Sequence, residues 1–292
     1  MSFVVFLSFI LLTGSCHKSD DNVSNGTPAP PPQAVKAGYE TLVFNDDFDS
    51  LESIDVKGTK KSGYKWYVDA PIWGSGITDP SAYNVSNSVL TVTSDGYTAN
   101  WTLTSYSPGG KVGYSFRYGY FEARIRFNPK LGKIARGFPA WWCFSVNHSV
   151  NGDPSRWAEL DFYEAYTGGY ADYNGLFVGT VHDWANDSKT HYQNSNNVQW
   201  LSDTTFSKWH TYGCLWTPGR ITWYFDNDSL MTQTYSADKT PYPQTNPHAP
   251  VGTFSILDTE PLGMMLILGS DEKWPMEVDW VRVWRANKTL ME

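Results

Sequence analysis

The segment that most constrains the fold of this chain is residues 157–164, with the sequence Trp-Ala-Glu-Leu-Asp-Phe-Tyr-Glu. It places three carboxylates in an otherwise apolar and aromatic run. Side chains on a β-strand alternate between two faces, so Ala158 and Leu160 share one face while Glu159 and Asp161 share the other. We therefore expect a strand with one face in the core and one face that carries chemistry.

Glu164 departs from this alternation, because a regular strand would direct its carboxylate into the core, where an unpaired charge is costly. A one-residue bulge at Phe162 or Tyr163 would redirect it. Bulges re-aim side chains and are over-represented beside active sites. With such a bulge, the sequence predicts that Glu159, Asp161 and Glu164 form a single row.

A row of carboxyl groups with this spacing suits retaining glycoside hydrolysis. In that reaction one carboxylate attacks the anomeric carbon and a second carboxyl group, roughly 5 to 5.5 Å away, protonates the leaving oxygen. Glu159 and Glu164 are the candidates, and negative charge on Asp161 between them would tend to keep one neighbour protonated. From spacing alone, the alternative is a solvated acidic edge strand.

The rest of the chain consists of short strand-like segments separated by turn residues, with few helical periods. Residues 120–127 alternate cleanly, with Phe121, Ala123, Ile125 and Phe127 on one face and polar or aromatic residues on the other. All-β folds of 292 residues are often a single domain. We expect an all-β protein, an antiparallel β-sandwich or jelly roll.

Five segments occur in the order typical of glycoside hydrolase family 16, and residues 39 to 287 resemble that family. They are the acidic segment, residues 118–125 (Tyr-Gly-Tyr-Phe-Glu-Ala-Arg-Ile), residues 137–142 (Gly-Phe-Pro-Ala-Trp-Trp), residues 209–226 and residues 278–284. The resemblance implies a concanavalin-like β-jelly roll with a concave substrate cleft. It also implies a retaining endo-β-glycosidase that needs no cofactor for catalysis.

The resemblance also implies roles for individual residues. Glu159 takes the nucleophile position, Glu164 the acid/base position and Asp161 that of an assisting carboxylate. His182 resembles a histidine often found near the acid/base. Two departures bear on the substrate: Tyr163 stands where laminarinase-like members carry Met, and residues 266–270 lack their Asn-x-Ala-x-Gly-Gly pattern.

These departures favour a β-galactan such as agar, porphyran, carrageenan or host galactan slightly over a β-1,3-glucan. A transglycosylase, which would form longer products beside shorter ones, is a second enzymatic hypothesis. A third hypothesis is that the protein is not an enzyme but a noncatalytic surface glycan-binding lipoprotein. The intact set of Glu159, Asp161 and Glu164 argues against it, because binding alone does not require that acid pair.

A sugar cleft needs flat apolar surfaces, and four tryptophans are candidates for substrate binding: Trp142, Trp157, Trp184 and Trp216. Trp157 has the most direct support, since strand alternation places it on the same face as Glu159. For the other three, packing in the core is an equally good interpretation.

The chain begins with an apolar run too short to span a bilayer, which suggests the core of an export signal. Residues 12–16, Leu-Thr-Gly-Ser-Cys, resemble a bacterial lipoprotein processing site. We therefore expect a signal peptide at residues 1–15, a lipidated Cys16, a Pro-rich tether at residues 16–38 and a catalytic domain at residues 39–292. The protein would be an exported outer-membrane or cell-surface lipoprotein, with ordinary soluble secretion as the alternative.

The net charge of −8 and the pI near 5.2 argue against a nucleic-acid partner. The expected partner is a polysaccharide, with membrane contact only through the lipid at Cys16, and a monomer is expected. Cys143 and Cys214 could pair in an exported protein, although we favour free thiols. The family resemblance also implies a structural calcium ion near Asp47 and Asp279, away from catalysis.

Overall fold

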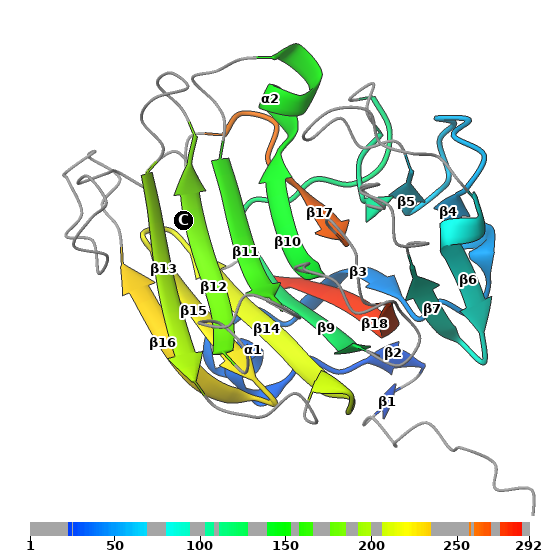
Figure 1. Cartoon of the computed structure of the whole chain (residues 1–292). Coiled ribbons are helices and arrows are strands. Elements are labelled where there is room, and N and C mark those ends of the chain that lie inside the picture. Colours follow the sequence, from blue (N-terminus) through cyan, green and yellow to red (C-terminus); the bar gives the residue numbers. More distant parts are fainter. Residues whose placement is uncertain are drawn as a thin grey trace, which may run out of the picture.

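A computed structural model of the chain describes thirteen segments of the sequence. They are residues 23–24, 26–68, 80–93, 103–107, 111–127, 139–152, 158–165, 176–184, 192–199, 206–234, 257, 260–269 and 275–287. Most of the described strands form two eight-stranded sheets that pack face to face (Figure 1). The expectation of an all-β sandwich is confirmed.

Sheet 1 contains the acidic segment near its middle. Its strands, in spatial order, are β13 (Tyr192–Gln199), β12 (Leu176–Asp183), β11 (Ala158–Glu164), β10 (Ala140–Ser145), β17 (Met264–Leu268), β8 (Leu103–Thr104), β5 (Trp66–Tyr67) and β4 (Ile54–Asp55). All neighbouring strands are antiparallel except β4 and β5. A short helix, α2 (Val146–Asn151), follows β10 directly.

Sheet 2 lies behind sheet 1 and is antiparallel throughout its described pairs. Its strands, in order, are β16 (Asp228–Thr234), β15 (Arg220–Phe225), β14 (His210–Thr217), β9 (Gly119–Phe127), β18 (Met276–Arg285), β7 (Val89–Val92) and β6 (Tyr83–Ser86), and β3 (Thr41–Asp46) also pairs with β18. The remaining elements are β1 (Val23–Ser24), β2 (Thr27–Pro28), α1 (Pro32–Lys36), η1 (Leu51–Ser53) and η2 (Pro80–Ala82). None of the described helices is long and apolar enough to cross a bilayer.

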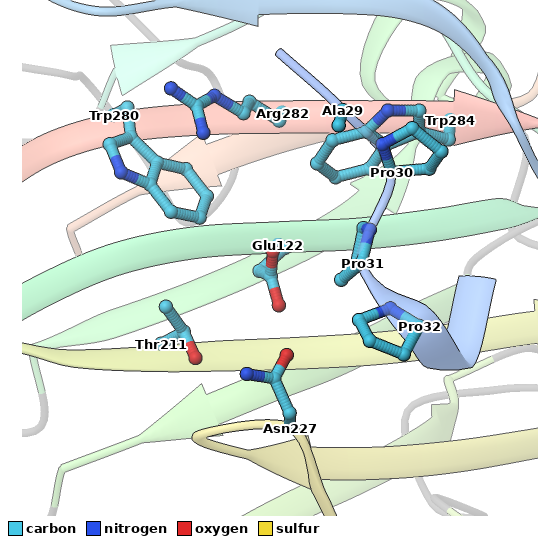
Figure 2. Close-up of a pocket in the computed structure, with 10 residues that line it drawn as sticks. All are labelled: Ala29, Pro30, Pro31, Pro32, Glu122, Thr211, Asn227, Trp280, Arg282 and Trp284. Carbon is cyan, nitrogen blue, oxygen red and sulfur yellow. The ribbon is translucent and has the colours of Figure 1, made fainter. Parts of the chain in front are cut away.

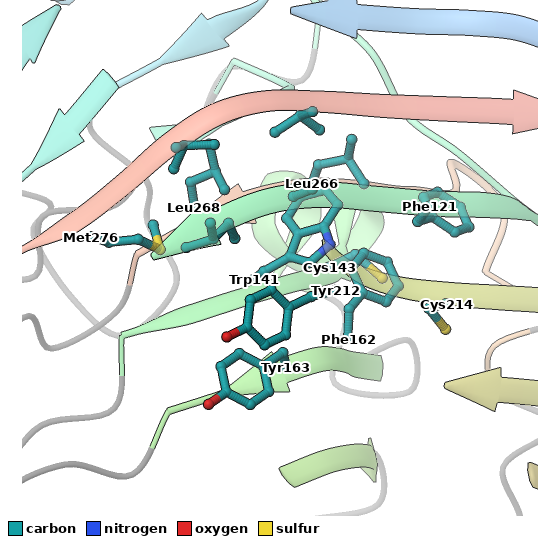
Figure 3. Packing of buried hydrophobic residues seen from close by; sticks show 14 of the residues in the cluster. Phe121, Trp141, Cys143, Phe162, Tyr163, Tyr212, Cys214, Leu266, Leu268 and Met276 are labelled. Atoms are coloured by element: carbon teal, nitrogen blue, oxygen red, sulfur yellow. The ribbon is translucent and has the colours of Figure 1, made fainter. Parts of the chain in front are cut away.

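The main core lies between the two sheets and is rich in aromatic rings (Figure 3). Phe121 of sheet 2 stacks on Phe162 of sheet 1, with ring centroids 4.9 Å apart, and Trp141 contacts the same ring at 4.9 Å. Such pairs contribute about 0.5–1.5 kcal/mol beyond the apolar area they bury. They fix the strand that carries the carboxylates against the opposite sheet.

The predicted tether is shorter than residues 16–38, because its last part packs on sheet 2. Ala34 of α1 is fully buried with Tyr120 and Trp284, and Gln33 donates hydrogen bonds to the hydroxyl of Tyr120 and to Asn227. Periodicity could not predict this, since a five-residue helix after three prolines is shorter than the period that signals amphipathicity.

The prolines before α1 cover a pocket of about 320 Å³ on the outer face of sheet 2 (Figure 2). Trp280, Arg282 and Trp284 of β18 and Glu122 of β9 also line it. The guanidinium of Arg282 lies 4.1 Å from the ring centroid of Trp280. The start of the domain is therefore held on the side of the sandwich opposite to the outer face of sheet 1.

Candidate active site

β11 holds three buried carboxylates on one face of sheet 1, and a bulge makes this possible. Glu159 pairs with Phe144 of β10 and His182 of β12, whereas Glu164 pairs with Ala140 and Val178. The register shifts between Asp161 and Glu164 on both sides.

Phe162 and Tyr163, which are consecutive in sequence, consequently both point into the main core. The predicted bulge is confirmed, and it brings Glu164 back to the face of Glu159 and Asp161. A regular strand could not place all three carboxylates on that face.

Trp223 of β15 stabilises the bulge from the opposite sheet. Its indole Nε1 donates a hydrogen bond to the backbone oxygen of Asp161 at 2.8 Å. The indole fits there because Gly179 of β12 has no side chain: a Cβ at that position would lie 2.4 Å from Trp223 Nε1. Sequence reasoning missed both residues, because only the pairing of the two sheets brings β15 beneath β11.

Glu159 is surrounded by hydrogen-bond donors from β12 and the residue that follows it. Trp184 Nε1 donates to Glu159 Oε2 at 3.1 Å, and His182 Nε2 lies 3.6 Å from Glu159 Oε1. His182 and Trp184 stack on each other, with centroids 5.1 Å apart. The structure thus places two of the predicted site residues directly against this carboxylate.

Asp161 is the most deeply buried of the three carboxylates, with 1% of its surface exposed. Its Oδ2 lies 3.1 Å from His182 Nε2. Burial raises the pKa of Asp161 well above its ordinary value, and a hydrogen bond to Glu159 opposes part of that change. A buried carboxyl of this kind holds a proton more readily than one in water.

The pKa of Glu159 is also raised well above its ordinary value. Burial is the largest cause, followed by the charge of Asp161, and the charge of Glu164 adds to it. His182 and the hydrogen bond from Trp184 act in the opposite direction and favour the anion. Glu159 and Asp161 therefore both hold a proton more readily than carboxyls in water do, and their protonation is coupled.

An apolar surface lies beside the row of carboxylates. Trp142 and Phe144 of β10 share it with Met265 and Ile267 of β17, and the partly buried Trp184 packs against it. Trp142 is 5% exposed, and its Nε1 donates to the backbone oxygen of Gly269 at 2.9 Å. The sequence predicted Trp142 and Trp184 but missed the others, because β10 and β17 are apolar on both faces and give no alternation to read.

Two predicted substrate-binding tryptophans differ from the expectation. Trp216 does not belong to this surface: it is fully buried in the main core on β14 and stacks with Phe121 at 6.3 Å. That prediction is wrong, because the alternation of β14 directs Trp216 inward toward sheet 1. Trp157 lies outside the described residues, as does Cys16.

The two aspartates predicted for calcium are each paired with an arginine. Asp279 pairs with Arg124 at 2.6 Å, and Asp47 pairs with Arg282 at 3.1 Å. An ion at these residues would have to compete with both arginines for the carboxylate oxygens, and the calcium site stays a prediction. Cys143 and Cys214 are buried free thiols in the main core, in agreement with the favoured expectation.

Comparison with known proteins identifies the family. Residues 78–280 match the family described as "Glycosyl hydrolases family 16". The protein named "Endo-1,3-1,4-beta-glycanase EglC" from Rhizobium meliloti is 29% identical over 229 residues, which are 70% of this chain and 45% of that protein. This chain therefore spans about half the length of that relative.

Two solved structures share the fold. The laminarinase from Flavobacterium sp. UMI-01 is 18% identical, with a TM-score of 0.55 over 84% of this chain and 100% of that one. The GlcNAcα1-4Gal-releasing endo-β-galactosidase from Clostridium perfringens is 20% identical, with a TM-score of 0.55 over 89% of this chain and 65% of that one. With the greater part of its sequence matched to the family, and with the bulged carboxylate strand in sheet 1, this chain belongs to glycosyl hydrolases family 16.

Proposed function

We propose that the protein is a retaining endo-β-glycosidase that hydrolyses internal β-linkages of a β-glucan. The observation that carries this proposal is the β11 bulge, which places Glu159, Asp161 and Glu164 on one buried face. Two carboxyls on one face, with a third between them, provide the nucleophile and the proton donor that this reaction needs.

Glu159 is the better nucleophile, because its anion is stabilised by the Trp184 N–H and by His182. Its carboxylate attacks the anomeric carbon while Glu164 donates its proton to the leaving oxygen, and the glycosidic bond breaks. Glu164, now ionised, takes a proton from water. The resulting hydroxide attacks the anomeric carbon, releases Glu159 and yields a product with retained configuration.

Asp161 assists this reaction by its position between the two glutamates. It shares a hydrogen bond with Glu159 and contacts His182 Nε2, so proton transfer within this group changes the charge of Glu159 without solvent. A site of this kind couples the protonation of the three groups, and its pH profile reports on the set rather than on one residue.

The relative from Rhizobium meliloti supports a β-1,3- or β-1,3-1,4-linked polymer as substrate, since its name describes an endo-1,3-1,4-β-glycanase. The sequence departures, which favoured a galactan, concern one position and one five-residue segment. Phe144 and Ile267 are fully buried, so Trp142 and the partly buried Trp184 are the aromatic side chains that could contact sugar rings of either kind. We therefore place β-1,3- and mixed β-1,3-1,4-glucans first in the test.

The test is product analysis after incubation of the protein with laminarin, mixed-linkage β-glucan and agarose, together with NMR of the first anomer formed. We expect oligosaccharides of the β-configuration from a glucan and none from the Glu159→Gln variant. An α-anomer as first product, or equal cleavage by the variant, would overturn the mechanism. Binding of a polymer without cleavage would favour the glycan-binding lipoprotein, and products longer than the substrate would favour a transglycosylase.

We also propose that the protein is an exported lipoprotein anchored through Cys16 and acts as a monomer. The Leu-Thr-Gly-Ser-Cys sequence and the position of the domain start on sheet 2 support this proposal. Mass spectrometry of the protein from bacterial membranes should show a diacylglyceryl group on Cys16 that is absent from Cys16→Ser. An unmodified soluble protein would indicate ordinary secretion.

A further inference from the structure

We propose that Glu159, Asp161 and His182 form a binding site for a divalent transition-metal ion of the zinc type, and that the bound ion blocks the substrate. This site would make the enzyme sensitive to free zinc. The inference rests on the proposed function only in that the blocked reaction is glycoside hydrolysis. The binding itself depends on the side chains alone.

The spacing of the three potential ligand atoms is the first argument. One donor atom from each side chain lies within 4.8 Å of the other two. His182 Nε2 lies 3.1 Å from Asp161 Oδ2 and 3.6 Å from Glu159 Oε1. A tetrahedral zinc ion with bonds of about 2.0–2.1 Å holds its ligand atoms about 3.3 Å apart. The two separations that involve His182 are therefore already close to what zinc requires, and the third is at most 4.8 Å.

The state of Asp161 is an independent second argument. Its Oδ2 is buried and has no hydrogen-bond partner. His182 Nε2 contacts it at 3.1 Å, but without the alignment of a hydrogen bond. A buried acceptor in this state carries a desolvation penalty of about 1–3 kcal/mol or more. A cation between Asp161 and His182 would satisfy it.

Trp184 supplies an outer contact of the kind that orients metal ligands. Its Nε1 donates to Oε2 of Glu159, which leaves Oε1 on the side of His182. One imidazole nitrogen with two carboxylate oxygens suits zinc, whereas calcium and magnesium prefer oxygen ligands alone. Three protein ligands leave the fourth tetrahedral position open to water.

Occupation of this site would oppose catalysis in a defined way. The ion would bind the carboxylate that attacks the anomeric carbon, so metal and substrate would exclude each other. Binding requires all three ligands in their deprotonated forms, and any protons they hold are released to solvent. Inhibition should therefore be competitive with the glucan.

The experiment measures zinc binding to the full chain by isothermal titration calorimetry after treatment with a chelator, beside inhibition kinetics. We expect one zinc ion per chain, competitive inhibition, and at least a tenfold loss of zinc affinity in His182→Ala. Asp161→Asn gives the same loss and serves as the second variant if His182→Ala does not fold.

The matched control is His210→Ala. His210 and Asp226 form another imidazole–carboxylate pair at 2.6 Å, at the start of β14 and outside the cluster. The control should bind zinc as the wild type does. Absence of stoichiometric binding, or binding lost in His210→Ala and kept in His182→Ala, overturns the inference.

Glu164→Gln separates this inference from the proposed function, because Glu164 is not among the three ligands. We expect this variant to lose hydrolysis and to keep zinc binding. If the wild type hydrolyses glucan but binds no zinc, the metal site alone is wrong. If zinc binds through His182 but no polysaccharide is cleaved, the proposed function is wrong and the metal site stands.

Discussion

The outer faces of the two sheets both carry buried acidic residues, but the partners of these residues differ between the two faces. On sheet 2, Glu277 is 8% exposed and Asp279 is 7% exposed, and each forms an ion pair with an arginine of β9. On sheet 1, Glu159 is likewise 8% exposed but no described arginine or lysine pairs with it. Burial alone therefore does not distinguish a structural carboxylate from a chemical one.

The difference lies in the partners across the strands. Arg126 forms two hydrogen bonds of 2.8 Å with Glu277, and Trp209 lies over the guanidinium groups of Arg124 and Arg126. Such charge-assisted pairs are strong and hold the carboxylates in a fixed geometry. On sheet 1 the described side-chain contacts of Glu159 and Asp161 include an imidazole and an indole but no arginine, so these carboxyls can exchange protons, as acid–base catalysis requires.

The largest effect is expected from Glu164→Gln, compared with Glu277→Gln on the other face. Loss of the proton donor should lower kcat on glucan by roughly 10²–10⁴-fold, while Glu277→Gln leaves kcat unchanged. An aryl glycoside with a good leaving group needs no protonation, so formation of the glycosyl-enzyme should be much less affected in Glu164→Gln. Steady-state and burst kinetics measure both quantities. Equal losses on the two substrates would contradict the assigned role.

Gly179→Ala should come next, because the new methyl group would overlap the indole of Trp223. Overpacking of this kind lowers the free energy of unfolding by about 1–3 kcal/mol. Displacement of the indole should also disturb the bulge and lower kcat/KM. Urea denaturation and kinetics measure the two effects.

Trp223→Phe is the companion variant for the bulge. It removes the hydrogen bond to the Asp161 carbonyl without adding volume, and should lower kcat/KM with a smaller loss of stability. Unchanged activity in both variants would show that the bulge does not depend on Trp223.

Asp161→Asn and Glu277→Gln should change stability in opposite directions at pH 7. Burial raises the pKa of Asp161 in the folded protein, so the wild type loses stability as pH rises above the pKa of the unfolded chain. Below that pKa both states are protonated and no penalty remains. We expect Asp161→Asn to raise Tm by roughly 2–4 °C at pH 7, equivalent to about 1 kcal/mol in the free energy of unfolding. Near pH 3 we expect no change in Tm.

Glu277→Gln breaks the ion pair with Arg126 and should lower Tm at pH 7 by a similar or larger amount. Calorimetry between pH 3 and pH 8 gives both curves. A fall in Tm for Asp161→Asn at pH 7 would show that its carboxylate is stabilised by the fold, as those of sheet 2 are.

The smallest effect is expected from Trp184→Phe. The indole N–H lowers the pKa of Glu159, so its removal should raise that pKa further. Because the nucleophile must be ionised, the acidic limb of the pH profile of kcat/KM should move to higher pH. We expect kcat/KM at the optimum to fall by about two- to tenfold. A pH profile that does not move would show that Trp184 acts only by packing.

The chemistry of β11 could be predicted from the sequence because it depends on local rules. Alternation in a strand fixes the faces of Glu159 and Asp161, and the cost of a buried charge requires a bulge before Glu164. Those rules act within eight consecutive residues and do not need the rest of the chain. The fold class followed similarly, from the short alternating segments.

Tertiary structure alone decided what surrounds that strand. The register of β12 and the pairing of the sheets bring His182, Trp184 and Trp223 to β11, and no local pattern encodes either. Packing between the sheets also places Trp216 in the main core. α1 packs on the outer face of sheet 2, which its sequence did not predict. The sequence determined which residues carry the carboxylates. Long-range packing determined their neighbours, and through those neighbours the distribution of their protons.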